Sequence, residues 1–78
     1  MTMSRTEVAA IRKADGAEIR VAIDTYKGRR VVDIRLWFQP TGSAEYVPSR
    51  KGVTFDTDKL PELSQAIADA VKQVGEVG

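Results

Sequence analysis

The five residues from Tyr26 to Arg30 read Tyr-Lys-Gly-Arg-Arg and bring together an aromatic ring, a turn glycine and three cations. The segments on both sides alternate between apolar and polar residues, as β-strands do. A glycine between two such segments predicts a tight turn, so these cations would stand at the tip of a β-hairpin. Positive charge clustered beside an aromatic ring is typical of a surface that binds a polyanion.

The two strands that flank this turn each have one apolar face and one polar face. Their polar face collects Arg20, Arg35 and Trp37. Guanidinium groups can neutralise phosphates and an aromatic ring can stack on an unpaired base, so this face suits single-stranded nucleic acid. Exposed arginines are also often only solvated, and a tryptophan next to a phenylalanine at a strand end often belongs to the core. Both interpretations stay open at this point.

Composition excludes several other kinds of chemistry. The chain has 78 residues, with no cysteine and no histidine, so it lacks disulfides, thiolate metal ligands and the commonest general base. The acids Asp24 and Asp33 stand alone on strands and do not form an acid and base pair. We therefore expect no enzyme, no catalytic residues, no metal and no cofactor.

The length allows one domain with a small core. We expect a flexible tail over residues 1–6, a single domain over residues 7–75 and a flexible C-terminus over residues 76–78. No apolar run approaches the roughly 20 residues that cross a bilayer, and the first residues lack the apolar stretch of a secretory signal. These features predict no membrane partner and a cytoplasmic protein, nucleoid-associated if it is prokaryotic.

The charge is divided unevenly along the chain. Residues 1–55 hold ten Lys+Arg against six Asp+Glu, a difference of +4, whereas residues 56–78 hold two against five, a difference of −3. A positive sheet and a negative helix would steer an anionic ligand to one side of the molecule. Chance asymmetry in a short chain is the alternative.

The order of turn signals predicts a meander of four antiparallel strands. A first strand is expected over residues 7–14 and a second over residues 18–26, with Asp15-Gly16 as the turn between them. The third strand follows the basic turn and ends before the loop of residues 39–43. The fourth starts near Val47 and is interrupted at Pro48, which should lie on an edge or at a bulge. A second basic cluster, Arg50 and Lys51, lies within it.

After Phe55 the apolar period changes from two to about 3.6, which predicts one amphipathic C-terminal helix. Asp56 is the expected N-cap and Gly75 the expected end. The apolar stripe looks long enough both to cover the sheet and to meet a second copy, so we hypothesise a homodimer. Its expected interface residues are Leu60, Leu63, Ile67, Ala70, Val71 and Val74.

Two smaller expectations concern single residues. Gly28 and Gly52 are expected to serve turn geometry, because glycine reaches positive φ without steric cost. Asp33 is expected to make a cross-strand ion pair with a neighbour such as Arg20.

Taken in order, the Tyr26-Lys27-Gly28-Arg29 strand end, the Val32-Asp33-Ile34-Arg35 strand, the Pro48-to-Gly52 turn and the single helix resemble a known family. The chain is similar to the transcriptional positive cofactor four family, in particular to its small prokaryotic members, over about residues 18–74. The resemblance implies an α+β fold, in which a curved four-stranded antiparallel sheet is followed by one helix. It also implies a homodimer through the helices that binds single-stranded DNA.

Candidate contacts to nucleic acid come from this resemblance together with the polar strand face. They are Arg20, Tyr26, Lys27, Arg29, Arg30, Arg35, Trp37, Phe38, Arg50 and Lys51. Eukaryotic members have a tryptophan where this chain aligns Phe38, whereas simple alternation places Trp37 beside Arg35. A bulge near the strand end could reconcile the two. Val47 stands where relatives can carry a lysine, so one phosphate contact would be missing.

These observations predict sequence-tolerant binding of single-stranded DNA, with RNA as a further ligand, in transcription or in replication and repair. The alternative is a protein-interaction dimer that recruits a transcription factor or polymerase without touching nucleic acid. The choice between DNA and RNA, the stacking aromatic, the protein partners and the source organism all stay open.

Overall fold

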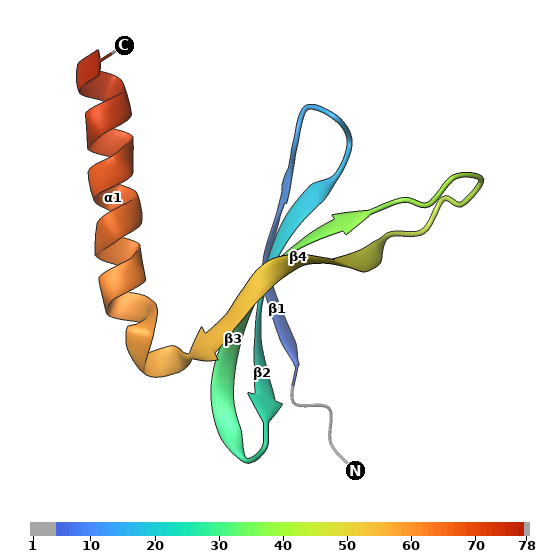
Figure 1. Cartoon of the computed structure of the whole chain (residues 1–78), viewed down its shortest axis with the longest axis horizontal. Helices are drawn as coiled ribbons and strands as arrows, with labels where there is room; N and C mark the ends of the chain where they lie inside the picture. The colour runs from blue at the N-terminus through green and yellow to red at the C-terminus, as the bar shows by residue number, and fades with distance from the viewer. Residues whose placement is uncertain (1–4, 78) are drawn as a thin grey trace.

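The fold is a four-stranded antiparallel sheet followed by one long helix, as expected (Figure 1). The computed structural model describes residues 5–77. The strands follow in chain order and pair with their sequence neighbours: β1 (Thr6–Arg12), β2 (Glu18–Tyr26), β3 (Arg29–Phe38) and β4 (Val47–Asp56). A short 3-10 helix, η1 (Thr57–Lys59), then leads into α1 (Leu60–Val77). The predicted meander and fold class are confirmed.

Both hairpin turns follow from the residues that form them. In the β2–β3 turn, Lys27 and Gly28 have φ angles of 52° and 78°, the left-handed pair that a two-residue type I′ turn requires. In the β1–β2 turn, Gly16 has a φ of 92°, and the Asp15 carboxylate accepts a hydrogen bond from the Ala17 N–H at 3.0 Å.

Several boundaries differ from the prediction. The first strand runs over Thr6–Arg12 and not over residues 7–14, because the Asp15-Gly16 turn already begins at Lys13, whose carbonyl accepts from the Gly16 N–H. Thr6 therefore belongs to the sheet, although it was expected in the tail. Arg5 of the expected tail is described and precedes β1, whereas residues 1–4 and the terminal Gly78 lie outside the described residues.

Of the two expected helix ends, the N-cap is confirmed in position and the C-terminal end is wrong. Asp56 precedes η1, yet its side chain makes no capping hydrogen bond. Gly75 lies inside α1, which continues to Val77. A glycine inside a helix costs only about 1 kcal/mol relative to alanine, so it ends the helix only where its backbone adopts the left-handed conformation. Gly75 does not have a positive φ.

The buried core is small. Only Ala22, Val31, Val32 and Asp33 are buried among the described residues. The accessible surface is 6138 Å², whereas a compact protein of 8.6 kDa exposes about 4,700 Å². The radius of gyration, 14.8 Å, likewise exceeds the roughly 11.5 Å of a compact chain of this length. The single chain therefore leaves surface uncovered.

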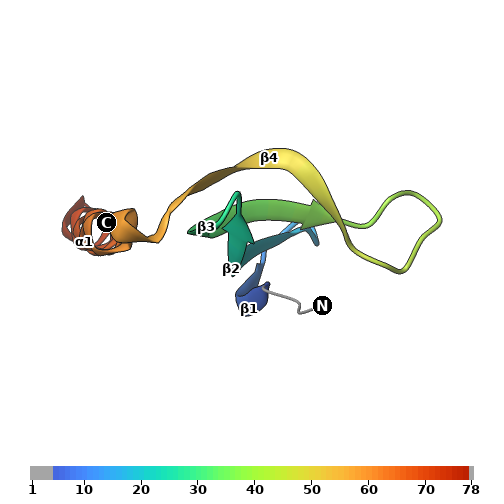
Figure 2. The same ribbon diagram turned by 90° about the horizontal axis from the view of Figure 1, so that it is seen from below.

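That uncovered surface has two parts. The helix α1 points away from the strands instead of lying across them (Figures 1 and 2). Its stripe residues Ile67, Val71 and Val74 are 55%, 67% and 72% exposed. The apolar face of the sheet is also open, because Ile11 and Val53 are each 56% exposed. Among residues 5–77, no strand covers the helix stripe and the helix does not cover the sheet.

Candidate nucleic-acid interface

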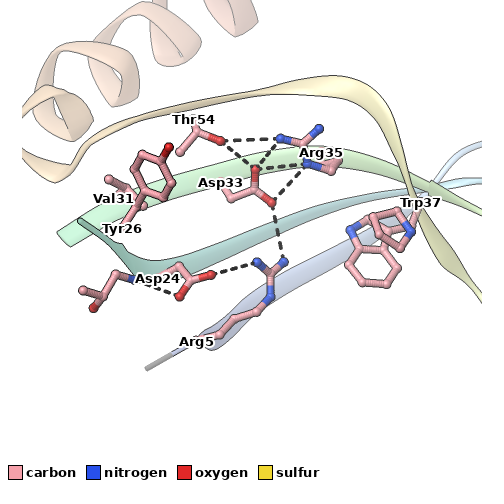
Figure 3. A pocket seen from close by; sticks show the side chains of 10 residues that line it. Arg5, Asp24, Tyr26, Val31, Asp33, Arg35, Trp37 and Thr54 are labelled. Carbon is pink, nitrogen blue, oxygen red and sulfur yellow. Dashed lines mark hydrogen bonds and ion pairs between the residues drawn. The ribbon is translucent and has the colours of Figure 1, made fainter. Parts of the chain in front are cut away.

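The centre of the polar sheet face is a buried carboxylate, Asp33, surrounded by donors (Figure 3). Arg35 donates from Nη2 to Asp33 Oδ1 at 2.9 Å, and the Thr54 hydroxyl donates to the same oxygen at 3.0 Å. Arg5 lies 3.5 Å from Oδ2 on the other side. Burial opposes ionisation of Asp33, but the hydrogen bonds from Arg35 and Thr54 outweigh it and hold the pKa of this carboxyl below its usual value.

This network corrects the expected partner of Asp33. In the β2–β3 register Asp33 lies opposite Ala22, whereas Arg20 lies opposite Arg35. Two arginines face each other, and each turns to an acid two residues away on its own strand. Arg20 donates to Glu18 at 2.9 Å, and this hydrogen bond lowers the pKa of Glu18. Arg20 and Arg35 are therefore both engaged within the protein.

Trp37 is held in a stack of cations and rings on the same face. The Arg20 guanidinium lies 4.4 Å from the centre of its ring and 5.2 Å from that of Tyr46, and Arg5 approaches Trp37 at 5.9 Å. These are cation–π distances. The Tyr46 hydroxyl donates to the Gly16 carbonyl at 2.7 Å, which ties the β3–β4 loop to the β1–β2 turn. The stack occupies one face of the indole that a base would need.

A hollow of about 530 Å³ opens on the polar face between the network and the hairpin tip (Figure 3). Its walls combine aromatic rings with charged groups. The lining residues are Arg5, Asp24, Thr25, Tyr26, Val31, Asp33, Arg35, Trp37, Pro48 and Thr54. We call this depression the polar hollow.

The hairpin tip, residues 26–30, is exposed at one end of this hollow. Tyr26 is 59% exposed and carries the Lys27 ammonium 5.3 Å from its ring centre. Arg29 donates from Nε to Asp56 at 3.3 Å and from Nη2 to the second carboxylate oxygen. These bonds raise the pKa of Arg29 above its ordinary value, so its charge is fixed. Arg30 is exposed and has no ion pair within residues 5–77.

The second basic cluster stands on a bulge of the edge strand β4. Arg35 pairs with Gly52 and Trp37 with Pro48, so Ser49, Arg50 and Lys51 all lie opposite Leu36. We call these three residues the β4 bulge. It is fastened by a hydrogen bond from the Lys51 N–H to Ser49 Oγ at 3.0 Å and by one from Arg35 Nη1 to the Ser49 carbonyl at 3.1 Å. Bulges re-aim side chains, and both Arg50 and Lys51 are exposed here.

The structure of the bulge confirms the expectation for Pro48 and corrects the one for Gly52. Pro48 lies on an edge strand and next to the register shift, as predicted. Gly52 does not provide a positive φ, because only Gly16, Gly28 and Gly42 do so among the described glycines. Instead, a Cβ at Gly52 would come within 2.7 Å of the Ile34 carbonyl oxygen and 2.9 Å of the Arg35 Cα. Gly52 is needed because β3 and β4 approach closely at this point.

The two candidate stacking aromatics lie on opposite faces of the sheet. The β2–β3 register is unbroken up to Trp37, so Phe38 points away from the polar hollow that Trp37 lines. The β4 bulge shifts β4 and leaves β3 regular, so it does not bring the two rings to one face. Phe38 is 40% exposed at the end of β3, opposite Val47 and near the β4 bulge.

The predicted site residues therefore fall into three groups: the exposed hairpin tip, the exposed β4 bulge with Phe38 at its edge, and the half-buried set of Arg20, Arg35 and Trp37 on the polar face. Sequence reasoning missed the parts played by Arg5 and Tyr46. Arg5 was expected in the flexible tail. Instead it reaches Asp24 and Asp33, both 3.5 Å away, and only the register could have shown this.

Within residues 5–77 no group of three or more acidic, cysteine or histidine side chains could hold a metal ion. Nor does this part of the chain contain a helix that is long and apolar enough to cross a membrane.

Comparisons with known proteins agree with this geometry. A family model described as Transcriptional Coactivator p15 (PC4) matches residues 13–66. Two crystal forms of a PC4 homologue from Burkholderia pseudomallei, 29% identical, superpose with TM-scores of 0.76 and 0.74. They cover 87% and 91% of this chain and 98% and 95% of the other. No curated protein sequence matches.

A more distant structure shares the fold. It is the bacteriophage T5 homologue of the eukaryotic coactivator PC4, which is implicated in recombination-dependent DNA replication. The two chains are 19% identical and superpose with a TM-score of 0.61, over 94% of this chain and 80% of the other.

Proposed function

This chain belongs to the transcriptional coactivator p15 (PC4) family, and from that premise we propose that it binds single-stranded DNA as a homodimer, without strong sequence preference. The family match spans more than half of the chain, over residues 13–66. This family comprises DNA-binding, coactivator-like proteins and not enzymes.

The observation that carries the proposal is the exposure of four cations that have no acidic partner within residues 5–77. Lys27 and Arg30 stand on the hairpin tip, and Arg50 and Lys51 on the β4 bulge. By contrast, Arg5, Arg20 and Arg35 are held by carboxylates of the sheet. Unpaired cations on a fixed turn and a fixed bulge are available to phosphates without first breaking an internal ion pair.

The spacing of the two clusters suits an extended strand. Arg29 and Arg35 are six residues apart on β3, which is about 20 Å at 3.3 Å per residue. Arg35 pairs with Gly52, immediately after the β4 bulge. Phosphates at the two ends of the polar hollow would then hold several nucleotides between them, within the range that single-strand binders of this size cover.

For base stacking we propose Tyr26, which lines the polar hollow at the tip, and Phe38 at the end of β3, where a strand that leaves the hollow would pass to the opposite face of the sheet. Both rings are exposed and neither is covered by a cation stack like the one on Trp37. Tyr26 carries Lys27 close to its ring, so a base on the free face would lie beside a cation that can pair with its phosphate. We assign Trp37 to holding the polar face together.

Electrostatic binding of this kind has a measurable consequence. With four phosphates neutralised per chain, the logarithm of the affinity should fall with a slope of about −2.8 against the logarithm of salt concentration. Raising salt from about 50 to 200 mM would then weaken binding roughly 50-fold. Fluorescence anisotropy of a labelled thymidine oligonucleotide measures this slope, and a salt-independent affinity would refute the proposal.

The homodimer is supported by what the single chain leaves exposed. Its surface exceeds that of a compact protein by about 1,400 Å², more than the roughly 800 Å² that each partner buries in a standard interface. The stripe of α1 is the most continuous apolar part of this surface. We propose that it pairs with a second copy through Leu60, Leu63, Ile67, Ala70, Val71 and Val74.

The oligomeric state has a simple test. Replacing Val71 with Glu puts a charge into the centre of the stripe, so light scattering should report a mass near 8.6 kDa for the variant and twice that for the parent. Lys72→Glu, on the polar side of the same helix, is the matched control and should stay dimeric. A parent protein that scatters as one chain at micromolar concentration would remove the homodimer.

The cellular setting that we propose is the cytoplasm, wherever duplexes open during transcription, replication or repair. RNA is the ligand to compare first, because neither stacking nor phosphate contacts distinguish it from DNA. If the protein bound neither nucleic acid at low salt, the fold would instead serve as a protein-interaction dimer, and transcription factors or polymerase would be the partners to examine.

A further inference from the structure

Arg29 differs from the other tip cations because an acid already holds it. Two of its nitrogens bond to the carboxylate of Asp56, the last residue of β4. We call this contact the tip pair. Both members can be reached by solvent, since their side chains are 68% and 35% exposed. A phosphate that approached the tip would meet a carboxylate already in the place it would take.

Asp56 also occupies a position where its side chain has a second use. It immediately precedes η1 in extended conformation, with φ −64° and ψ 147°, as N-cap residues do. Aspartate is among the preferred N-cap residues, yet the Asp56 side chain makes no capping bond. The carboxylate that could cap the helical segment is bound to Arg29 instead.

A hollow of about 300 Å³ lies where these groups meet. It is lined by Arg29, Arg30, Asp56, Thr57 and Asp58, so it joins the hairpin tip to the start of the helical segment. Its two arginines favour an anion, and its two aspartates oppose one. Whether the hollow attracts an anion therefore depends on whether Asp56 stays bound to Arg29.

We propose that Asp56 competes with nucleic acid for Arg29: it holds the guanidinium in the free protein, and a backbone phosphate displaces it in the complex. The displaced carboxylate then turns to cap the helical segment that begins at Thr57. Asp56 thus lowers the affinity of the tip for phosphate and links strand binding to the start of the helix. This inference rests on the proposed function, because it needs a bound strand.

The expected size of the effect is modest, since the tip pair is exposed. Exposed ion pairs are worth up to about a factor of five in an equilibrium constant. Asp56→Asn keeps a side chain that can cap and removes the charge that holds Arg29. It should tighten binding of a labelled 20-nucleotide thymidine strand about three-fold at 50 mM salt.

A double-mutant cycle separates competition from general electrostatics. In an Arg29→Ala background, Asp56→Asn should change the dissociation constant by less than about 1.5-fold, because the cation it competes for is gone. Asp58→Asn, an equal charge change two residues away that breaks no bond to Arg29, should tighten binding less than Asp56→Asn does. Equal tightening by Asp56→Asn in both backgrounds would overturn the proposal.

A second readout tests the capping step. Melting temperatures of the strand-bound proteins should be lower for Asp56→Ala than for Asp56→Asn, because only asparagine can cap once the tip pair is broken. Equal values would overturn the capping step. If the parent protein bound no single-stranded DNA at low salt, the proposed function itself would fail. If it bound the strand and the two mutations were additive in the cycle, only the competition between Asp56 and phosphate would fail.

Discussion

Replacing Asp33 with Asn should destabilise the fold more than any other single change of charge on the sheet. The carboxylate is only 7% exposed and accepts bonds from Arg35 at 2.9 Å and Thr54 at 3.0 Å. A bond to a charged group is worth about 1.5–3 kcal/mol and a neutral one about 1 kcal/mol. Because Arg35 is partly solvated, we take the low end and expect a loss of about 2–3 kcal/mol in the free energy of unfolding.

The assay is thermal unfolding followed by circular dichroism at one fixed protein concentration, since a dimer's stability depends on concentration. With an unfolding entropy of about 2.1 cal/mol/K per residue, each kcal/mol lowers the melting temperature by roughly 6 °C, so Asp33→Asn should melt about 12–18 °C lower. Glu7→Gln is the matched control, because its ion pair with Arg5 is half exposed and should contribute under about 1 kcal/mol. A drop for Asp33→Asn no larger than that of the control would refute the central role of this network.

The same carboxylate gives the prediction a pH dependence. Burial of Asp33 opposes its ionisation, but the bonds from Arg35 and Thr54 outweigh burial, so its pKa is lower in the folded than in the unfolded chain. The stability that ionised Asp33 contributes is therefore complete above the pKa of the unfolded chain, about 4. It is lost as the pH falls through the lower pKa of the folded protein. The difference in melting temperature between parent and Asp33→Asn should be largest near neutral pH and shrink in acid. A difference that stayed constant down to about pH 2 would contradict this linkage.

Three further substitutions test other parts of the account. Gly52→Ala should cost about 1–3 kcal/mol in unfolding free energy, because the new Cβ would meet β3 backbone at 2.7–2.9 Å; unchanged chemical denaturation would refute the close approach. Lys27→Asn should raise stability by about 0.5 kcal/mol, because asparagine tolerates the left-handed conformation, while the salt slope of binding becomes less steep by about 0.7. Phe38→Ala should weaken strand binding by about 1–3 kcal/mol at an unchanged melting temperature, whereas Trp37→Ala should chiefly lower the melting temperature. The reverse pattern would make Trp37 the stacking ring.

Much of the sheet could be predicted because its signals are local. In β2 the residues Ile19, Val21 and Ile23 alternate with Arg20 and Asp24. Lys27-Gly28 is a turn that needs no tertiary contact to be recognised, so β2 was predicted with its observed bounds. Pro48 likewise restricts a strand to an edge or bulge through its own missing donor. Such features depend on a few neighbouring residues, so they can be recognised from the sequence alone.

The residues that were misjudged depend on register and on long-range pairing. Asp33 was assigned to Arg20, but the strand alignment puts Ala22 opposite it and brings Arg5, 28 positions earlier in the sequence, to its side. Gly52 was assigned to a turn, although the β4 bulge places it where two backbones nearly touch. Asp56 occupies the expected N-cap position, but its carboxylate accepts from Arg29 on the neighbouring hairpin and does not cap. None of these contacts can be inferred from spacing along the chain.

Fluorescence anisotropy of a labelled single-stranded DNA of about 20 nucleotides, with matched duplex and RNA as competitors at about 50 and 200 mM salt, shows directly whether the protein binds single strands through their phosphates. We expect binding at low salt that duplex DNA does not compete away and that weakens roughly 50-fold at the higher salt. No binding at low salt, or binding that duplex DNA displaces equally well, would contradict this expectation.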